Sequence, residues 1–205
     1  DYDYDADGNY YVGWYAAPLA ADAESGLAGY ELQERVEPAG AWTTVVPATA
    51  ARYAYRSGRV HTTQYVYQVR AKNGAGLWGA WSPVSDGLLV DKTAPAAVTV
   101  TDDGAVAASA TELHATWTAS SDAESGIVEY QYLIGQSAPW IILVPWTSVG
   151  LATEVTKTGL SLVPGKLYYF GVRAKNGAGG YSATRYADGI RAPGPPPPPP
   201  PRPPP

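Results

Sequence analysis

The chain has 205 residues, which is enough for one or two domains, and its formal net charge at pH 7 is −5. This acidic balance excludes the basic surface that a nucleic-acid-binding protein needs. The chain contains no cysteine, which excludes disulfides, thiol chemistry and thiolate metal sites.

An acidic segment opens the chain. Asp3, Asp5 and Asp7 precede Gly8 in the pattern DxDxDG. Carboxylates at alternate positions can converge on one hard cation, and the glycine allows a sharp turn. The glutamate that an EF-hand carries at its twelfth position is absent, because Trp14 stands there. The segment predicts either a calcium site at these three aspartates or a solvated acidic start, and the second interpretation is the simpler one.

Two motifs occur twice in the chain. The pentapeptide DAESG occupies residues 22–26 and 122–126. The octapeptide VRAKNGAG occupies residues 69–76 and 172–179, which lie 103 residues apart. A repeat with this spacing predicts two self-contained modules, each with a core of its own.

Strand patterns alternate with turn signals in both copies. Residues 113–117 alternate apolar with polar positions, and residues 65–70 and 168–173 are rich in aromatic and β-branched side chains. The longest apolar run, residues 140–145, is too short for a membrane span and predicts a buried strand. No segment has a sustained helical pattern. The sequence therefore predicts an all-β chain of antiparallel β-sandwiches.

The repeats predict an order of four regions. Residues 1–90 form the first sandwich, residues 91–97 a linker, residues 98–191 the second sandwich, and residues 192–205 a tail. The first copy has no counterpart of the first strand of the second copy, near residues 98–100. Truncation at a processing boundary explains this omission most simply. The alternative is a strand supplied by another chain on the open sheet edge.

The tail contains seven consecutive prolines, from Pro195 to Pro201, followed by Arg202 and three more prolines. Proline fixes φ and lacks an amide donor, so this segment predicts an extended polyproline II helix. It is interpreted either as a stiff spacer or as a ligand for an aromatic groove. The candidate partner-binding residues are the aromatic residues in or beside loops and the ends of the proline run: Trp78, Trp81, Trp140, Tyr181, Pro195 and Pro201.

Taken together, both copies resemble fibronectin type III domains over residues 8–191. Trp117 resembles the tryptophan that the second strand of that family places in the core. Tyr168 follows a leucine and a proline at a spacing similar to that of the family, so it resembles the tyrosine-corner residue. Trp14 and Tyr65 match in the first copy, where residues 56–61 replace that spacing.

The resemblance implies two tandem immunoglobulin-like sandwiches in which these four aromatic residues are structural. The chain most resembles the aromatic-rich tandem repeats of prokaryotic surface and secreted proteins. This resemblance implies an extracellular or cell-surface location.

No group of residues predicts catalysis. The acidic pairs Asp22 with Glu24 and Asp122 with Glu124 lie in the repeated DAESG turns, where aspartate and serine cap local backbone. His61 and His114 have no counterparts in the other copy and no accompanying nucleophile or second ligand. The sequence predicts no enzyme and no cofactor other than the calcium considered above.

We expect a non-catalytic extracellular module with a structural or adhesive role. In its sharper form it is a subunit of a surface fibre, and its proline tail docks on a neighbouring subunit. The alternative is a carbohydrate-binding accessory or spacer module of a secreted polysaccharide-degrading enzyme, with aromatic rings stacked on sugars. The expected partners are proteins or further copies of the chain, with polysaccharide as the alternative, and neither nucleic acid nor a membrane span.

Overall fold

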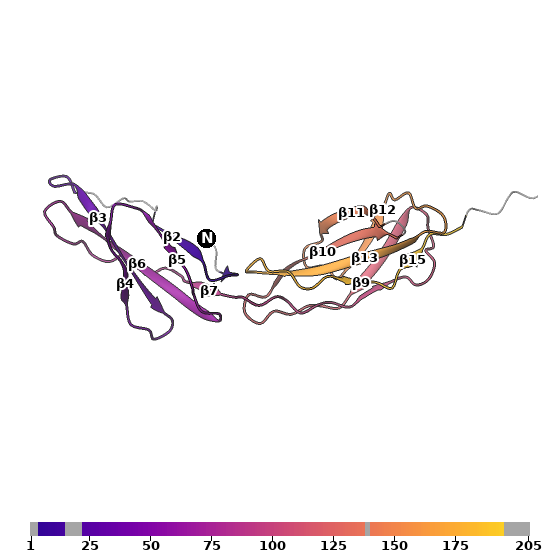
Figure 1. The fold of residues 1–205 in the computed structure, drawn as a ribbon, viewed down its shortest axis with the longest axis horizontal. Coiled ribbons are helices and arrows are strands. Elements are labelled where there is room, and N and C mark those ends of the chain that lie inside the picture. The colour runs from indigo at the N-terminus through magenta and orange to yellow at the C-terminus, as the bar shows by residue number, and fades with distance from the viewer. Residues whose placement is uncertain (1–3, 15–21, 138–139, 195–205) are drawn as a thin grey trace, which may run out of the picture. The chain divides into compact units, whose positions relative to one another are not determined.

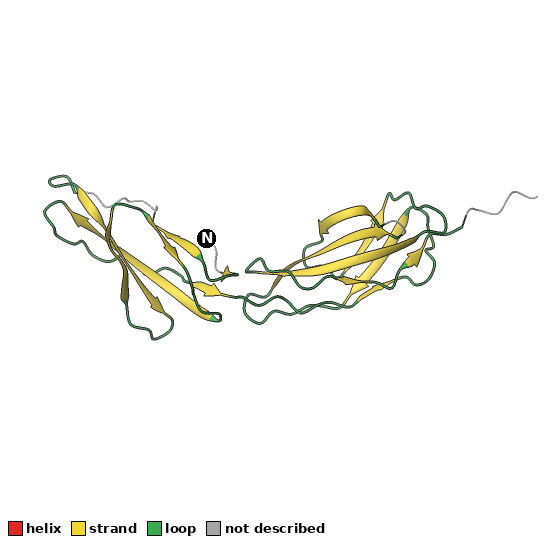
Figure 2. Cartoon of the chain, viewed as in Figure 1, coloured by secondary structure: helices red, strands yellow, loops and turns green. Residues whose placement is uncertain are grey.

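A computed structural model describes residues 4–14, 22–137 and 140–194 of the chain. The described residues form strands, turns and loops, without helix (Figure 2). Accordingly, this part of the chain has no helix that is long and apolar enough to cross a membrane. The chain divides into two compact units, with the main division between Thr93 and Ala94. Strands of each unit are labelled in Figure 1. The predicted all-β fold is therefore confirmed.

Unit 1, whose main segment ends at Thr93, contains two sheets. The larger sheet has the strand order β1-β7-β6-β3-β4, and the smaller pairs β2 with β5. All pairings are antiparallel except that of β1 with β7. The strands are β1 (Tyr4–Asp5), β2 (Tyr10–Gly13), β3 (Leu27–Val36), β4 (Thr43–Thr49), β5 (Tyr53–Arg56), β6 (Thr63–Asn73) and β7 (Leu88–Val90).

Unit 2, which begins at Ala94, also contains two sheets. One has the order β11-β10-β13-β14, with β15 also paired to β13, and the other has the order β12-β9-β8. The pairings are all antiparallel. The strands are β8 (Val100–Asp102), β9 (Glu112–Trp117), β10 (Ile127–Gln136), β11 (Ile141–Ser148), β12 (Glu154–Thr158), β13 (Leu167–Asn176), β14 (Arg185–Tyr186) and β15 (Ile190–Arg191).

The core of unit 2 follows from alternation along its strands. On β9, Leu113, Ala115 and Trp117 are buried and the residues between them are more exposed. Successive side chains of a strand point to opposite faces, so one face of β9 supplies these three residues to the core. They pack with Ile134 of β10 and Phe170 of β13 in one apolar cluster. The predicted period of two over residues 113–117 is confirmed.

The core of unit 1 is smaller and contains a buried polar network. Glu34 of β3 pairs in register with Tyr67 of β6. The corresponding pair in unit 2 is Ile134 of β10 with Phe170 of β13. Tyr67 donates a hydrogen bond to Glu34 Oε2 at 2.8 Å, and its hydroxyl oxygen lies 2.8 Å from that of Tyr10. Burial raises the pKa of Tyr10 to about 12, so this phenol stays protonated.

Two arginines complete the network around the Glu34 carboxylate. Arg56 Nε lies 3.0 Å from Oε2, and Arg59 Nη1 lies 2.6 Å from Oε1. A buried carboxylate is tolerated only where charge and hydrogen bonds compensate its lost hydration. Here both oxygens have such partners.

The prediction of a buried strand over residues 140–145 is wrong in part. The segment does form most of β11, but Trp140, Ile141 and Ile142 are all exposed, and Val144 is its buried member. The cause is the sandwich architecture, in which each strand meets the core with one face only. An apolar run therefore does not establish burial on both faces, and β11 also lacks a neighbour on one side because it lies at the edge of its sheet.

The octapeptide VRAKNGAG ends a strand and makes the following turn in both copies. Strand β6 ends at Asn73 and β13 ends at Asn176. Three residues later, Gly76 and Gly179 each have a φ of 87°. This left-handed conformation strains residues that carry a Cβ, which accounts for glycine at both positions.

Candidate functional site

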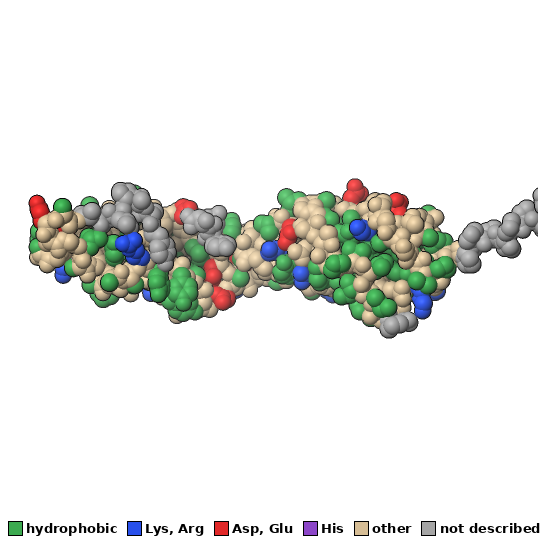
Figure 3. All heavy atoms as spheres, turned by 90° about the horizontal axis from the view of Figure 1, so that it is seen from above, with side chains coloured by type: hydrophobic (Ala, Val, Ile, Leu, Met, Phe, Trp, Pro, Cys, Tyr) green, Lys and Arg blue, Asp and Glu red, His purple; other side chains and the backbone are tan. Residues whose placement is uncertain are grey.

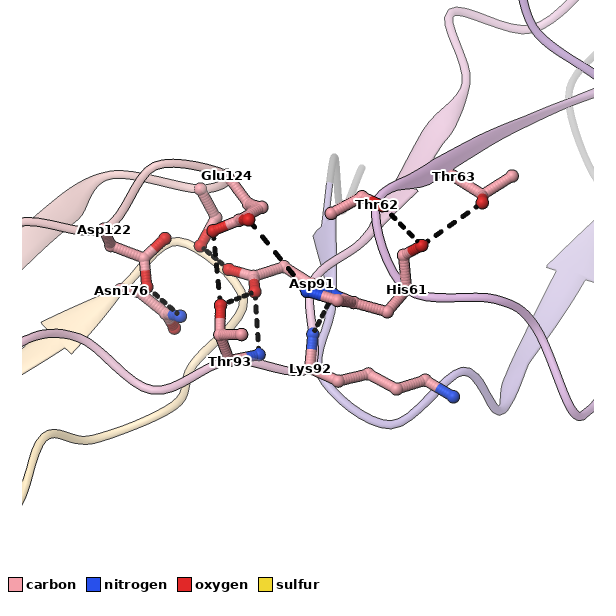
Figure 4. Close-up of polar contacts among 10 residues, drawn as sticks. His61, Thr62, Thr63, Asp91, Lys92, Thr93, Asp122, Glu124 and Asn176 are labelled. Atoms are coloured by element: carbon pink, nitrogen blue, oxygen red, sulfur yellow. Dashed lines mark hydrogen bonds and ion pairs between the residues drawn. The ribbon is translucent and has the colours of Figure 1, made fainter.

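The repeated acidic turns are fastened to the ends of the long strands. In unit 1, Asn73 Nδ2 donates to Asp22 Oδ2 at 3.0 Å. In unit 2, Asn176 Nδ2 donates to Asp122 Oδ2, also at 3.0 Å (Figure 4). Asp22 additionally accepts the backbone N–H of Ser25 at 2.6 Å. The two motifs repeated in the sequence therefore bind to each other within each copy, and their aspartates act as turn anchors.

The first prediction concerns the pH dependence of this anchor. The side-chain hydrogen bond from Asn73, with further bonds from Ser25, lowers the pKa of Asp22 from its usual 3.8 to about 2. Because the folded-state pKa is depressed, the stabilisation is present above about pH 4 and is lost as the pH falls towards 2. We expect the unfolding temperature to fall less steeply across this window in Asp22→Asn than in the parent chain. Calorimetry over a pH series measures the difference, and parallel curves would contradict the assignment.

The N-terminal aspartates make a local turn. Asp5 Oδ1 accepts the N–H groups of Asp7, at 3.2 Å, and of Gly8. Asp7 Oδ1 accepts the N–H of Asn9 at 2.7 Å. Asp3 lies outside the described residues. Calcium at Asp3, Asp5 and Asp7 therefore stays a prediction, while the two described carboxylates are already used as backbone caps.

The two histidines have separate structural partners. His61 Nδ1 accepts the backbone N–H of Lys92 at 3.1 Å in unit 1 (Figure 4). His114 Nδ1 lies 2.7 Å from Asp103 Oδ1 in unit 2. Each ring is thus held by its own unit.

The four aromatic residues predicted to be structural make corresponding contacts in the two units. The hydroxyl of Tyr65 accepts the N–H of Val60 at 3.1 Å, and that of Tyr168 accepts the N–H of Val163 at 2.8 Å. In each case the tyrosine ties its strand to backbone five residues upstream, as a tyrosine corner does. Trp14 and Trp117 each lie beside a tyrosine of the neighbouring sheet, with ring centroids 6.2 Å and 6.1 Å apart.

Three of the predicted partner-binding rings stack on cations of their own unit. The Arg70 guanidinium lies 4.7 Å from the Trp78 ring centroid and 4.3 Å from that of Trp81. In unit 2, Arg173 lies 3.8 Å from the Tyr181 centroid and 4.2 Å from that of Trp146. Cation–π contacts of this kind occupy ring faces that a ligand would use. Partner binding by Trp78, Trp81 and Tyr181 stays a prediction, and Pro195 and Pro201 lie outside the described residues.

The fourth predicted ring, Trp140, belongs to a group of aromatic side chains on unit 2. Its centroid lies 6.1 Å from that of Tyr169, with an angle of 35° between the planes, and 5.9 Å from that of Tyr186, with an angle of 89°. We call Trp140, Tyr169 and Tyr186 the aromatic platform. Sequence reasoning missed both tyrosines. The available signal was the period of two on β13, which places Tyr169 on the face opposite to Tyr168 and Phe170.

A second exposed aromatic group lies on the small sheet of unit 1. Tyr11 of β2 stands with Tyr53 and Tyr55 of β5, at centroid distances of 5.9 Å and 5.0 Å. The Tyr11 plane is inclined by 68° to Tyr53 and by 49° to Tyr55. The alternating order of Tyr53, Ala54 and Tyr55, with the alanine buried, was the signal for this group. We call these three residues the tyrosine cluster.

Comparison with known proteins relates the chain to parts of larger ones. No protein-family model matches it. The chain is 36% identical over 174 residues to endoglucanase B of Cellulomonas fimi, and 32% identical over 188 residues to exoglucanase B of the same organism. These matches cover 82% and 86% of the chain but 15% of each relative.

Among solved structures, the chain is similar to the FN1–FN3 domains of chicken CNTN1. The TM-score is 0.55 at 20% sequence identity, and the match covers 92% of this chain and 65% of that chain. At this level of identity the similarity concerns the fold.

Proposed function

Because the chain has the fold of tandem fibronectin type III domains, we propose that it is a non-catalytic extracellular module of a secreted polysaccharide-degrading enzyme, serving as a spacer and accessory surface. The observation that carries this proposal is the pattern of similarity to endoglucanase B and exoglucanase B. This similarity spans 82% and 86% of the chain but 15% of each relative. Such a pattern fits an accessory segment of a larger enzyme.

The polar groups of the two units support a non-catalytic role. Asp22 and Asp122 anchor turns through Asn73 and Asn176. Glu34, the most completely paired carboxylate of the unit 1 core, is enclosed by two arginines and a tyrosine. General acid or base catalysis needs a carboxyl group within reach of a substrate proton. The carboxylates of Asp22, Asp122 and Glu34 instead bind hydrogen-bond donors of the fold itself.

A spacer role agrees with the construction of each unit. Each has its own core and its own tyrosine corner, so each is a separate packed body. A packed sandwich keeps its end-to-end length, whereas a flexible linker samples many end-to-end distances. The surface-fibre subunit with a docking proline tail stays a prediction, because residues 195–205 lie outside the described part of the chain.

The test is a chimera of endoglucanase B in which this chain replaces the matching segment. We expect hydrolysis of insoluble cellulose to match that of the parent enzyme and to exceed that of a control with a Gly/Ser linker of equal length. Hydrolysis of a soluble cellulose derivative should be the same in all three. Equal rates for the chain and the Gly/Ser linker on insoluble cellulose would contradict the proposal, as would release of reducing sugar by the isolated chain.

A further inference from the structure

The three rings of the aromatic platform lie directly on glycine backbone, at one glycine of β10, one of β13 and one just before β15. A Cβ added at Gly135 would lie 2.4 Å from Trp140 Cζ2, and one added at Gly189 would lie 2.6 Å from Tyr169 Cε1. At Gly171 a Cβ would lie 2.7 Å from Tyr186 Cε1. No side chain fits between these rings and the sheet. Each ring therefore packs on a glycine, with one side against the protein.

The platform covers the face of the sheet that points away from the core. Leu133 of β10 is 4% exposed, yet it does not belong to the core cluster of unit 2. Leu133 Cγ lies near Gly171, beside the Tyr186 ring. The Tyr186 ring thus lies beside an outward-facing buried leucine, which gives this face of the sheet an apolar contact of its own.

Covering glycines in a sheet stabilises it, and this structural role explains the inner sides of the rings. It does not explain their exposure. Trp140 and Tyr186 each remain 50% exposed, and Ile142, paired in register with Gly135, is exposed as well. Hydrophobic side chains gather over part of the surface of unit 2 (Figure 3). Broad exposed apolar surface on a rigid support is typical of a binding site.

Unit 1 does not repeat this surface. In unit 2, Gly135 of β10 pairs in register with Tyr169 of β13. The corresponding pair in unit 1 is Arg35 of β3 with Val66 of β6. Arg35 carries a charge and forms an ion pair with Glu37. The platform therefore differs between the two copies at this pair of positions, and it is built from uncharged residues only.

From this arrangement we propose that the aromatic platform of unit 2 binds a neutral β-linked glucan, with the sugar rings lying on the Trp140 and Tyr169 rings. The negative face of an aromatic ring attracts the positively polarised C–H groups on the flat face of a pyranose. The Trp140 and Tyr169 rings are neighbours, with an angle of 35° between their planes. Trp140 is 50% exposed and Tyr169 is half-buried beside it, so Trp140 offers the larger face to a glucan. The choice of glucan rests on the proposed function.

The absence of charge on the platform favours a neutral polymer over an acidic one. The proline tail is the competing occupant, because polyproline also binds aromatic surfaces. Polyproline recognition uses grooves lined by aromatic rings. The choice between the two occupants therefore rests on the proposed function, in which the relatives are glucanases. We therefore favour the glucan, and the tail becomes an outcome of the test.

The experiment measures retention of the full chain on microcrystalline cellulose. We expect Trp140→Ala to lower the partition coefficient about ten-fold, equivalent to about 1.4 kcal/mol. Gly135→Ala should act in the same direction with the tryptophan still present, because the new Cβ displaces the ring. Gly135 has no left-handed φ, so the backbone accepts alanine there. Unchanged far-ultraviolet circular dichroism verifies that both variants are folded.

The matched control is Tyr55→Ala in the tyrosine cluster, an exposed aromatic group of unit 1 to which the proposal assigns no glucan. We expect its retention to equal that of the parent chain. The inference is overturned if folded Trp140→Ala is retained normally. It is also overturned if the parent chain is not retained while a synthetic peptide of residues 194–205 binds it in a Trp140-dependent manner. If the inference fails but the chimera outperforms the Gly/Ser linker, the spacer proposal stands alone.

Discussion

Replacing Glu34 with alanine is expected to destabilise unit 1 by about 3 kcal/mol, because the change leaves two part-buried arginines without their carboxylate. The Arg56 and Arg59 side chains are 14% and 20% exposed, so solvent cannot replace the lost partner effectively. The Tyr67 hydroxyl loses its acceptor as well. A loss of this size is a large fraction of the stability of a single domain.

Urea unfolding measures this loss, and hydrogen exchange assigns it to β3 and β6 of unit 1. The control is Glu129→Ala in unit 2, which removes a carboxylate from a more exposed ion pair with Lys175 at 3.5 Å. Its effect should stay below about 1 kcal/mol, as for surface pairs generally. An equal effect of the two substitutions would show that the Glu34 network does not stabilise the core.

The reciprocal substitution in unit 2, Ile134→Glu, is expected to be at least as damaging. Ile134 is 0% exposed and pairs in register with Phe170, which has no polar atom to offer. The new carboxylate would therefore be buried without a donor, at a cost on the order of 4 kcal/mol or more. We expect unit 2 to lose its protection against hydrogen exchange while unit 1 keeps its own.

Val128→Glu provides the matched control for that experiment. Val128 lies on the same strand, β10, but is exposed, so a glutamate there keeps its hydration. We expect less than about 0.5 kcal/mol of destabilisation at such a position. Similar unfolding curves for Ile134→Glu and Val128→Glu would mean that the site of Ile134 is open to water.

The fold was predictable from the sequence because its signals are local. Alternation over residues 113–117, together with the turns that end β6 and β13, indicates strands and their limits without knowledge of their partners. Burial of an apolar run is different, since it depends on where the strand lies in the sheet. For this reason the prediction failed for residues 140–145, because β11 turns one face to the core and the other away from it.

The candidate sites were less predictable, because they depend on contacts between distant strands. Trp78 and Trp81 are aromatic residues beside loops, and their composition suggests a binding surface. Only the fold shows that the guanidinium of Arg70 lies against both rings. Trp140 was singled out from the sequence, but Tyr186 was not, since the two are brought together by strands on either side of β10 and β13.

The different cores of the two units have a consequence for folding during synthesis. Tandem copies of one fold can exchange strands while incomplete, and such misassembly is a characteristic failure of repeated domains. If β3 of unit 1 paired with β13 of unit 2, the Glu34 carboxylate would face Phe170 with no donor in reach. The exchanged pairing of β10 with β6 would place Ile134 against the Tyr67 hydroxyl. Each core therefore accepts its own strands better than those of its neighbour, which steers a nascent duplicated chain towards correct assembly.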